Sequence, residues 1–114
     1  MLTGLSAWLC VILQYVSNPL SNRRIRIGIV GCGRIAQKHL GAIKANEADC
    51  ELVALCDHDQ AAMDAMDADE SVARFESLDK MLEAGQLDLV SICTPSGVHA
   101  RQTIQCAQAG IPVM

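Results

Sequence analysis

The stretch IRIGIVGCGRIAQKHLGAI, which runs from Ile25 to Ile43, decides the fold of this chain. Its opening IRIGIV is rich in β-branched residues and stops at Gly31, which is typical of a buried strand. Residues 34–46 follow a helical period, and we expect the inner face of this helix to carry Ile35, His39, Leu40 and Ile43. A strand that leads through a glycine turn directly into a helix is the first unit of a parallel α/β sheet.

The rest of the chain alternates strands and helices in the same way. Short apolar runs predict further strands at residues 51–57, 72–75, 87–93 and 111–114. Helices are expected between them, at residues 60–66, 78–85 and 98–109. Asp59 and Ser77 are expected to cap the first two of these helices. Because parallel pairings need right-handed crossovers, the sequence predicts a Rossmann-type, doubly wound parallel sheet, incomplete and with about five strands.

The residues from Gly31 to Ala36 read G-x-G-x-x-A and fall between the first strand and its helix. In that setting Gly31 permits the tight turn, and Gly33 lets a pyrophosphate approach the backbone. The helix N-terminus would offer free N–H groups to the phosphates, with the charge of Arg34 and the thiol of Cys32 beside them. The motif predicts dinucleotide binding, although taken alone it also fits a simple turn that requires glycine. No base is expected near Cys32, so we do not expect it to be a nucleophile.

Asp57 ends the second expected strand, 26 positions after Gly31. An acid near this spacing bonds the ribose diol of adenosine in dinucleotide-binding sheets. Because a carboxylate there would repel a 2′-phosphate, NAD is favoured over NADP. The basic side chains of His58 and Arg34 leave NADP open as the cofactor, and a plain turn role for Asp57 stays open as well.

The turn Thr94-Pro95-Ser96-Gly97-Val98-His99 follows the fourth expected strand. Ligands of doubly wound sheets bind beyond the carboxyl ends of strands where the winding reverses, and the fourth strand is expected to flank the first. We therefore expect residues 94–99 to face the nicotinamide half of a dinucleotide. His99 also fits a partly exposed position in the first turn of a helix, whereas His39 is expected to be hydrogen-bonded on the inner face of its helix.

Composition and charge narrow the class of protein. The 114 residues are 51% apolar and 19% charged with a net charge of −4, which suits a single globular domain and argues against nucleic acid as a partner. Residues 23–44 hold six basic groups and no acid, which predicts an electropositive stretch that receives an anionic ligand. The six cysteines form no C-x-x-C pair, so we expect reduced thiols and no metal site.

Residues 1–22 carry no charge and include the apolar run from Leu5 to Val16. The flanks of this run do not fit a secretory signal, and it is shorter than the roughly 20 apolar residues of a membrane span, so a membrane is not an expected partner. Three interpretations stay open: a docking helix, a membrane anchor, or an upstream extension of the reading frame that belongs to no fold. We expect a separate segment over residues 1–22 and the dinucleotide-binding domain over residues 23–114.

With these residues placed, the chain resembles the N-terminal half of the glucose-fructose oxidoreductase, inositol dehydrogenase and MocA family. The resemblance is carried by the glycine-turn stretch 25–43, by ELVALCD (51–57), by SLDKML (77–82) and by VSICTPSGVHARQTIQCAQAGIPVM (90–114). It implies a cytoplasmic NAD(P)-dependent oxidoreductase that transfers hydride between nicotinamide and a hydroxyl of a sugar, cyclitol or nucleotide-sugar. The family's contacts to the pyrophosphate correspond here to Gly31, Gly33, Arg34 and Ile35. The contact to the adenosine ribose corresponds to Asp57. The contacts on the nicotinamide side correspond to Thr94, Pro95 and His99.

In this family the fifth strand runs into a Glu-Lys-Pro motif, whose lysine assists proton transfer, and then into a substrate domain. The sequence stops at Met114, before that motif. The resemblance therefore implies a truncated cofactor-binding domain that binds dinucleotide without turnover and has no catalytic residue of its own. A homo-oligomer is expected only of the full-length enzyme. A non-enzymatic module that binds or senses NAD stays open as the alternative.

Overall fold

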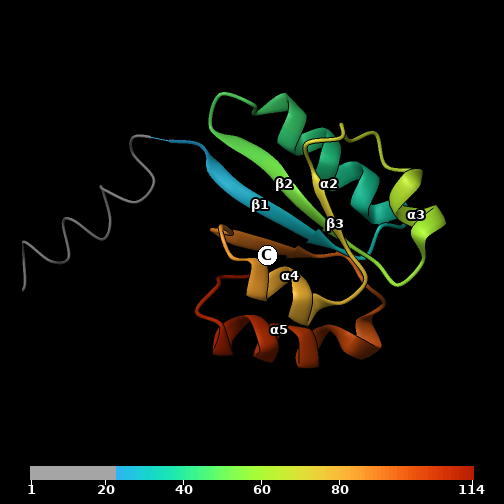
Figure 1. Ribbon diagram of the computed structural model, residues 1–114, viewed down its shortest axis with the longest axis vertical. Helices are drawn as coiled ribbons and strands as arrows, with labels where there is room; N and C mark the ends of the chain where they lie inside the picture. The colour runs from blue at the N-terminus through green and yellow to red at the C-terminus, as the bar shows by residue number, and fades with distance from the viewer. Residues whose placement is uncertain (1–22) are drawn as a thin grey trace, which may run out of the picture.

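The computed structural model describes residues 23–114, which form one parallel sheet with helices on both faces (Figure 1). The strands are β1 (Ile25–Val30), β2 (Cys50–Cys56), β3 (Ala73–Phe75) and β4 (Leu89–Ile92). They lie in the order β3-β2-β1-β4, and every pairing is parallel. The winding therefore reverses between β1 and β4, which confirms that the fourth strand flanks the first.

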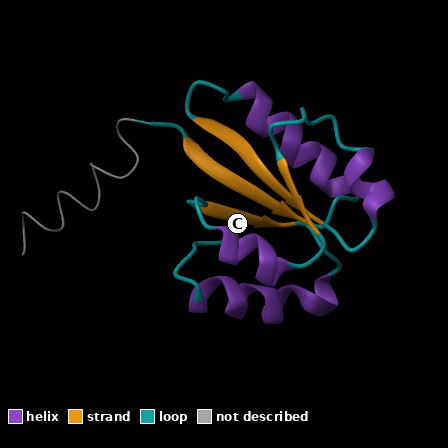
Figure 2. Ribbon diagram, in the orientation of Figure 1, coloured by secondary structure: helices purple, strands orange, loops and turns teal. Residues whose placement is uncertain are grey.

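The helices form a layer on each side of the sheet. They are α2 (Arg34–Ala45), α3 (Gln60–Asp64), α4 (Leu78–Ala84) and α5 (His99–Gln108), with a short 3₁₀ turn, η1 (Ser96–Val98), before the last. Figure 2 shows α2 and α3 against one face and α4 and α5 against the other. Burial of both faces explains why the strands are almost continuously apolar, as is typical of parallel sheets.

Alternate side chains of the strands supply two separate hydrophobic cores. Ile29 of β1 and Leu55 of β2 are fully buried beneath α2 and α3. Their neighbours Val30 and Cys56 belong to the other core, beneath α4 and α5, together with the fully buried Val90 of β4. The period of two along a strand thus divides each apolar run between the two layers.

Local side-chain contacts start and stop the two short helices as expected. Asp59 Oδ1 accepts a hydrogen bond from the backbone N–H of Ala61 at 3.0 Å, at the start of α3. Ser77 Oγ accepts one from the N–H of Lys80 at 3.3 Å, at the start of α4. Helix α4 then ends at Gly85, whose φ of +73° suits a residue without a Cβ.

The expected position of Ile35 on the inner face of α2 is wrong. Ala36, Leu40 and Ile43 make the buried row of this helix, whereas Ile35 is 47% exposed. Residues spaced by four and then three positions, as these are, lie on one side of a helix. Ile35 comes one residue before Ala36 and is therefore turned about 100° around the helix axis, away from the buried side. His39, as expected, is hydrogen-bonded: its Nδ1 lies 2.5 Å from Oγ of the fully buried Ser91.

The expected fifth strand is present only as a bridge on the outer edge of β4. Val113 pairs with Val90 in parallel, and the N–H of Met114 donates to the carbonyl of Val90 at 2.9 Å. The sheet within residues 23–114 therefore has four strands rather than five, extended at one edge by this short contact.

The three interpretations of residues 1–22 fall outside the described part of the chain. Between residues 23 and 114, no helix has both the length and the apolar character needed to cross a membrane.

Candidate functional site

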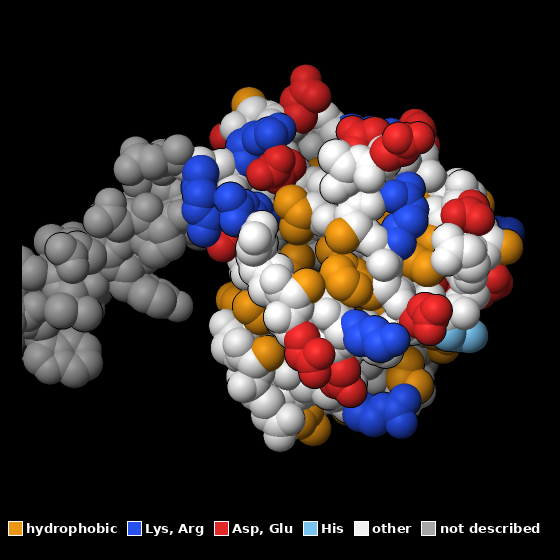
Figure 3. Space-filling view, viewed as in Figure 1, with side chains coloured by type: hydrophobic (Ala, Val, Ile, Leu, Met, Phe, Trp, Pro, Cys, Tyr) orange, Lys and Arg blue, Asp and Glu red, His pale blue; other side chains and the backbone are white. Residues whose placement is uncertain are grey.

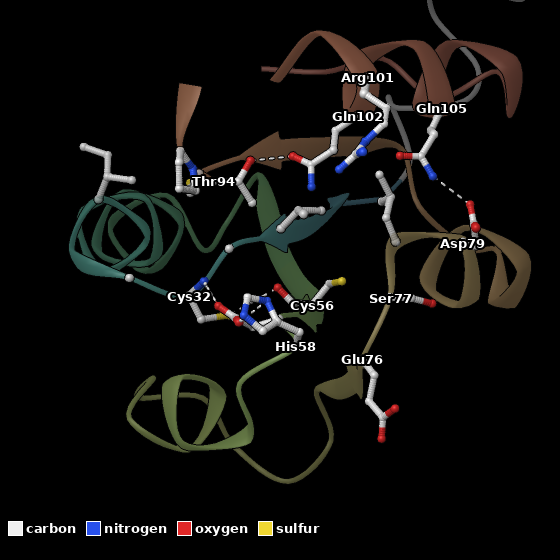
Figure 4. A pocket seen from close by; sticks show the side chains of 18 residues that line it. Cys32, Cys56, His58, Glu76, Ser77, Asp79, Thr94, Arg101, Gln102 and Gln105 are labelled. Carbon is white, nitrogen blue, oxygen red and sulfur yellow. Dashed lines mark hydrogen bonds and ion pairs between the residues drawn. The ribbon is translucent and has the colours of Figure 1, made fainter. Parts of the chain in front are cut away.

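A cleft of about 840 Å³ opens at the carboxyl ends of the strands. Its walls come from the glycine turn after β1, from Asp57 and His58 after β2, from the loop that leads into α4, and from the turn after β4. These segments are far apart in sequence and meet only because parallel strands end at the same edge of a sheet. Figure 4 shows the cleft with α5 on one side and the glycine turn across from it.

Gly31 joins the two turns that flank the cleft. Its φ is +88°, and a Cβ built at this residue would lie 2.8 Å from both the backbone N and the Cγ2 of Thr94. Only glycine combines this backbone conformation with so close an approach. The tight-turn role expected of Gly31 is therefore confirmed, and its second role is to bring the turn after β4 against the turn after β1.

Gly33 precedes helix α2 and leaves its N-terminus open. It has a φ of −92° and makes no side-chain capping bond, in contrast to Asp59 and Ser77 at the next two helices. A Cβ at Gly33 would meet nothing within 4 Å, and the residue lines the cleft. The first-turn N–H groups of α2 thus lie at the cleft without a capping side chain, beside the positive end of the helix dipole.

Asp57 ties the end of β2 to the glycine turn. Its Oδ2 accepts a hydrogen bond from the backbone N–H of Cys32 at 2.8 Å, and its Oδ1 accepts one from the N–H of Asp59 at 2.9 Å. The side chain is 13% exposed and lines the cleft. His58 is exposed, with Nδ1 at 3.5 Å from Oδ1 of Asp57. Since a carboxylate has about four lone-pair positions, Asp57 retains acceptor capacity toward the cleft.

The cysteines of the site are protonated thiols. Burial is the main cause that raises the pKa of Cys32 to about 12, and the negative charge of Asp57 adds to it. The same two causes, in the same order, raise the pKa of Cys56 to about 11. Neither thiol forms a reactive thiolate near neutral pH, in agreement with the expectation that Cys32 is not a nucleophile.

The turn after β4 is held by contacts within itself and with α5. Thr94 Oγ1 donates a hydrogen bond to Oε1 of Gln102, and the Nε2 of His99 contacts the carbonyl oxygen of Thr94. Thr94 and Pro95 line the cleft, but His99 does not. The ring of His99 thus contacts the turn itself and is not among the residues that line the cleft.

Sequence reasoning missed the wall of the cleft that α4 and α5 provide. Arg101, Gln102 and Gln105 of α5 line it, and Gln105 Nε2 donates to Oδ1 of Asp79 at 2.8 Å across to α4 (Figure 4). The arginine that lines the cleft is Arg101, whereas Arg34, which was expected there, is not among the lining residues. The spacing of 101, 102 and 105 after the turn, along one helical face, is the only signal in the sequence that could have pointed to them.

The expected electropositive stretch is partly neutralised in the fold. Arg23 bonds Asp88, Arg24 bonds Glu51 at 2.7 Å, and Lys44 bonds Asp67 at 2.7 Å. Acids from later parts of the chain thus pair with half of the six basic residues. On the face drawn in Figure 3, acidic and basic side chains are interspersed rather than separated.

The predicted site residues meet at this cleft with two exceptions, Arg34 and His99. The lining residues that had been predicted are Gly31, Cys32, Gly33, Ile35, Asp57, His58, Thr94 and Pro95. Within residues 23–114, no cluster of histidine, cysteine and acidic side chains has the composition of a metal site.

Comparison with known proteins adds an independent observation. A family model described as an oxidoreductase family with an NAD-binding Rossmann fold, GFO_IDH_MocA, matches residues 25–114. The chain is also similar to the inositol 2-dehydrogenase of Rhizobium meliloti (strain 1021), with 37% identity over 86 residues, which cover 75% of this chain and 26% of that protein.

Two solved structures resemble the chain in both fold and sequence. The WlbA dehydrogenase from Bordetella pertussis, in complex with NADH and UDP-GlcNAcA, has a TM-score of 0.75 and 45% identity, covering 80% of this chain and 28% of that one. The scyllo-inositol dehydrogenase from Lactobacillus casei, with NAD(H) and scyllo-inositol, has a TM-score of 0.71 and 33% identity, covering 80% and 27%. The chain therefore spans 26–28% of the length of these relatives.

Proposed function

The chain belongs to the glucose-fructose oxidoreductase, inositol dehydrogenase and MocA family, whose NAD-binding Rossmann domain it matches, and we propose that the cleft at the strand ends holds NAD. The observation that carries this proposal is the pairing of two features in one cleft. An uncapped helix N-terminus follows a glycine turn, and the carboxylate of Asp57 is bonded to that same turn. The first feature suits a diphosphate and the second suits a ribose diol.

The diphosphate would lie against the start of α2. Gly33 presents bare backbone to the cleft, and the open space beside it would be filled by any larger side chain. Free N–H groups and the helix dipole stabilise an anion there without a charged side chain. Arg34 is not among the residues that line the cleft, so the proposal gives the recognition of the phosphates to the backbone.

The adenosine end would lie toward Asp57. Its two oxygens already accept one backbone N–H each, which holds the carboxylate in place for a ribose hydroxyl. A fixed, mostly buried negative charge repels a 2′-phosphate, so NAD is the expected cofactor rather than NADP. His58, exposed beside the carboxylate, softens this preference without reversing it.

The nicotinamide end would lie toward Thr94 and Pro95. When bound, NAD supplies a nicotinamide ring that accepts or donates a hydride. Gly31 packs directly against Thr94, so the two turns would form one continuous wall beside this end of the dinucleotide. Oε1 of Gln102 accepts a hydrogen bond from the hydroxyl of Thr94 and thereby orients that side chain.

The whole protein is proposed to oxidise or reduce a hydroxyl of a polyhydroxylated ring. The support is chemical: one relative is an inositol dehydrogenase, and two solved relatives hold scyllo-inositol or UDP-GlcNAcA together with the cofactor. Cyclitols, sugars and nucleotide-sugars share secondary hydroxyls that can give up a hydride. This chain would supply the cofactor half of that reaction.

We place the protein in the cytoplasm with the dinucleotide as its partner. The described cysteines at positions 32, 50, 56, 93 and 106 are free thiols, as is usual in a reducing compartment. Nucleic acid is not proposed as a partner because the net charge is −4. A homo-oligomer is proposed only for the full-length enzyme.

Isothermal titration calorimetry of the 114-residue chain with NAD and NADP tests the proposal. We expect saturable binding of NAD and weaker binding of NADP. A Gly33→Leu substitution should abolish the heat, because the new side chain projects into the cleft. Gly41→Leu is the matched control, since Gly41 lies in helix α2, which Gly33 precedes, and has open space around it but does not line the cleft. Equal heats for the two variants, or none for the folded wild type, would overturn the proposal.

A further inference from the structure

The described residues that line the cofactor cleft include three acids and a single arginine. The acids are Asp57, Glu76 and Asp79, and the arginine is Arg101 of α5. Arg101 is exposed, and it takes part in none of the ion pairs within residues 23–114. A guanidinium that lies near carboxylates without pairing with them stays available to the phosphates of a ligand. The partners of the three acids explain why it is unpaired.

Two of the acids are placed away from α5. Asp57 accepts hydrogen bonds from backbone N–H groups in the glycine turn and at the start of α3, and the glycine turn lies across the cleft from α5 (Figure 4). Glu76 precedes α4, and its side chain points away from α5 in the same view. Asp79, in the first turn of α4, is therefore the acid that faces α5.

Gln105 holds this third acid. Its Nε2 donates a hydrogen bond to Oδ1 of Asp79 at 2.8 Å, from α5 across to α4. A hydrogen bond to a charged carboxylate is stronger than one between two neutral groups. Because the amide of Gln105 is neutral, it fixes the position of the carboxylate without being an ion pair.

Gln105 and Arg101 lie one helical turn apart on α5. Side chains four positions apart are neighbours on the surface of a helix, with their Cβ atoms about 5–6 Å from each other. Figure 4 shows both side chains extending from α5 into the cleft, toward α4. Without its hydrogen bond to Gln105, the carboxylate of Asp79 would therefore have the guanidinium of Arg101 as its nearest alternative partner.

We propose that Gln105 is a positioning residue for the dinucleotide. By holding Asp79, it leaves the guanidinium of Arg101 unpaired, so that this charge can attract the diphosphate. The inference rests on the proposed NAD site and names the source of its positive charge. Backbone N–H groups at the start of α2 would bind the diphosphate from one side of the cleft, and Arg101 would face it from the other. Loss of Gln105 would let Asp79 pair with Arg101 and neutralise it.

Calorimetric titration of the 114-residue chain with NAD at low salt tests this role. Gln105→Met keeps a side chain of similar length and removes the donor to Asp79. It should weaken binding by about twofold to fivefold, the loss expected when one exposed charge is neutralised, and the loss should shrink as the salt concentration rises. Gln108→Met is the matched control, because Gln108 is an exposed glutamine of the same helix that does not line the cleft. It should bind NAD like the wild type.

Removal of the acid separates the positioning role from a simple role in the shape of the cleft. Asparagine at position 79 has no charge with which to pair with Arg101. The double variant Asp79→Asn/Gln105→Met should therefore bind NAD at least as tightly as the wild type, although Gln105 is missing. The double variant Arg101→Met/Gln105→Met should bind no more weakly than Gln105→Met alone, because the arginine is already neutralised there. Circular dichroism checks that every variant is folded.

A measurement without ligand tests the pairing of Asp79 with Arg101. In the wild type, Arg101→Met should leave the urea midpoint unchanged, since Arg101 takes part in no ion pair within residues 23–114. In the Gln105→Met background, the same substitution should lower the midpoint because it breaks the new ion pair. A midpoint that responds equally in the two backgrounds would overturn the inference.

The titrations distinguish failure of this inference from failure of the proposed function. If the wild type binds NAD but Asp79→Asn does not restore the affinity of Gln105→Met, Gln105 acts through packing and the positioning role is overturned. Losses that multiply in Arg101→Met/Gln105→Met, or a loss in Gln108→Met as large as in Gln105→Met, overturn it as well. A folded wild type that gives no heat with NAD would overturn the proposed function, and the positioning role with it, whatever the urea midpoints show.

Discussion

The carboxylate of Asp57 and the backbone N–H of Cys32 are joined by a hydrogen bond of 2.8 Å across two turns that are 25 residues apart in sequence. One oxygen of Asp57 therefore stabilises the glycine turn while the carboxylate as a whole faces the cleft. The same side chain has a structural role and a proposed binding role.

Asp57→Asn should weaken NAD binding and reduce the discrimination against NADP. An amide carries no charge and has one oxygen acceptor, so it cannot serve both the Cys32 N–H and a ribose diol. Loss of a hydrogen bond to a charged group costs about 1.5–3 kcal/mol, or about a tenfold to hundredfold loss in affinity. Calorimetric titration with both dinucleotides measures the effect. Glu70→Gln, at an exposed position outside the cleft, should leave both affinities unchanged.

Gly31→Ala should destabilise the fold more than Gly110→Ala. Both glycines have a positive φ, +88° and +76°, so both substitutions impose the same kind of backbone strain. Only at Gly31 would the new Cβ also overlap Thr94, at 2.8 Å, whereas at Gly110 it meets nothing within 4 Å. We expect about 1–2 kcal/mol for the control, and several kcal/mol for Gly31→Ala because steric overlap adds to the strain. Urea unfolding of the two variants and the wild type measures the difference. Equal losses would show that contact with Thr94 does not constrain residue 31.

Stability should fall in alkaline solution as the buried thiols ionise. The pKa of Cys32 is raised from 9.0 to about 12, and that of Cys56 to about 11, so the native protein holds these protons more tightly than the unfolded chain does. The stabilisation is complete below pH 9, the unfolded value, and is lost as the pH rises toward 11 and 12. The free energy of unfolding, measured as a function of pH, should decline more steeply in the wild type than in Cys32→Ala. Parallel curves would contradict the assignment.

Arg101→Met should weaken dinucleotide binding at low salt by about twofold to fivefold. This corresponds to about 0.4–1 kcal/mol, the free energy expected for an ion pair exposed to solvent. Arg101 is the arginine that lines the cleft, and its attraction for an anionic ligand is screened by ions. The difference from the wild type should therefore shrink as the salt concentration rises. Lys80→Met removes a charge outside the cleft and serves as the control in the same titration. A loss that does not depend on salt would assign Arg101 a packing role instead.

Features that depend on neighbours in sequence were determined by the sequence alone. The glycine turn, the caps at Asp59 and Ser77 and the end of α4 at Gly85 follow from φ preferences and from hydrogen bonds that span two or three residues. The alternation of strands and helices predicted a parallel, doubly wound sheet for the same reason, because the period of apolar residues is a local property. The position of Asp57 at a strand end followed directly from that alternation.

The tertiary structure alone decided which side chains share a surface. Arg23 meets Asp88 across 65 positions of sequence and Gln105 meets Asp79 across 26, so neither pair was evident from spacing. Ile35 became exposed because the row that starts at Ala36 packs on the sheet, and Arg101 rather than Arg34 came to line the cleft. The physical reason is that local backbone and side-chain preferences decide whether a segment becomes a helix or a strand. Which other elements that segment contacts depends on how the elements pack together, and the linear pattern of residues does not specify this packing.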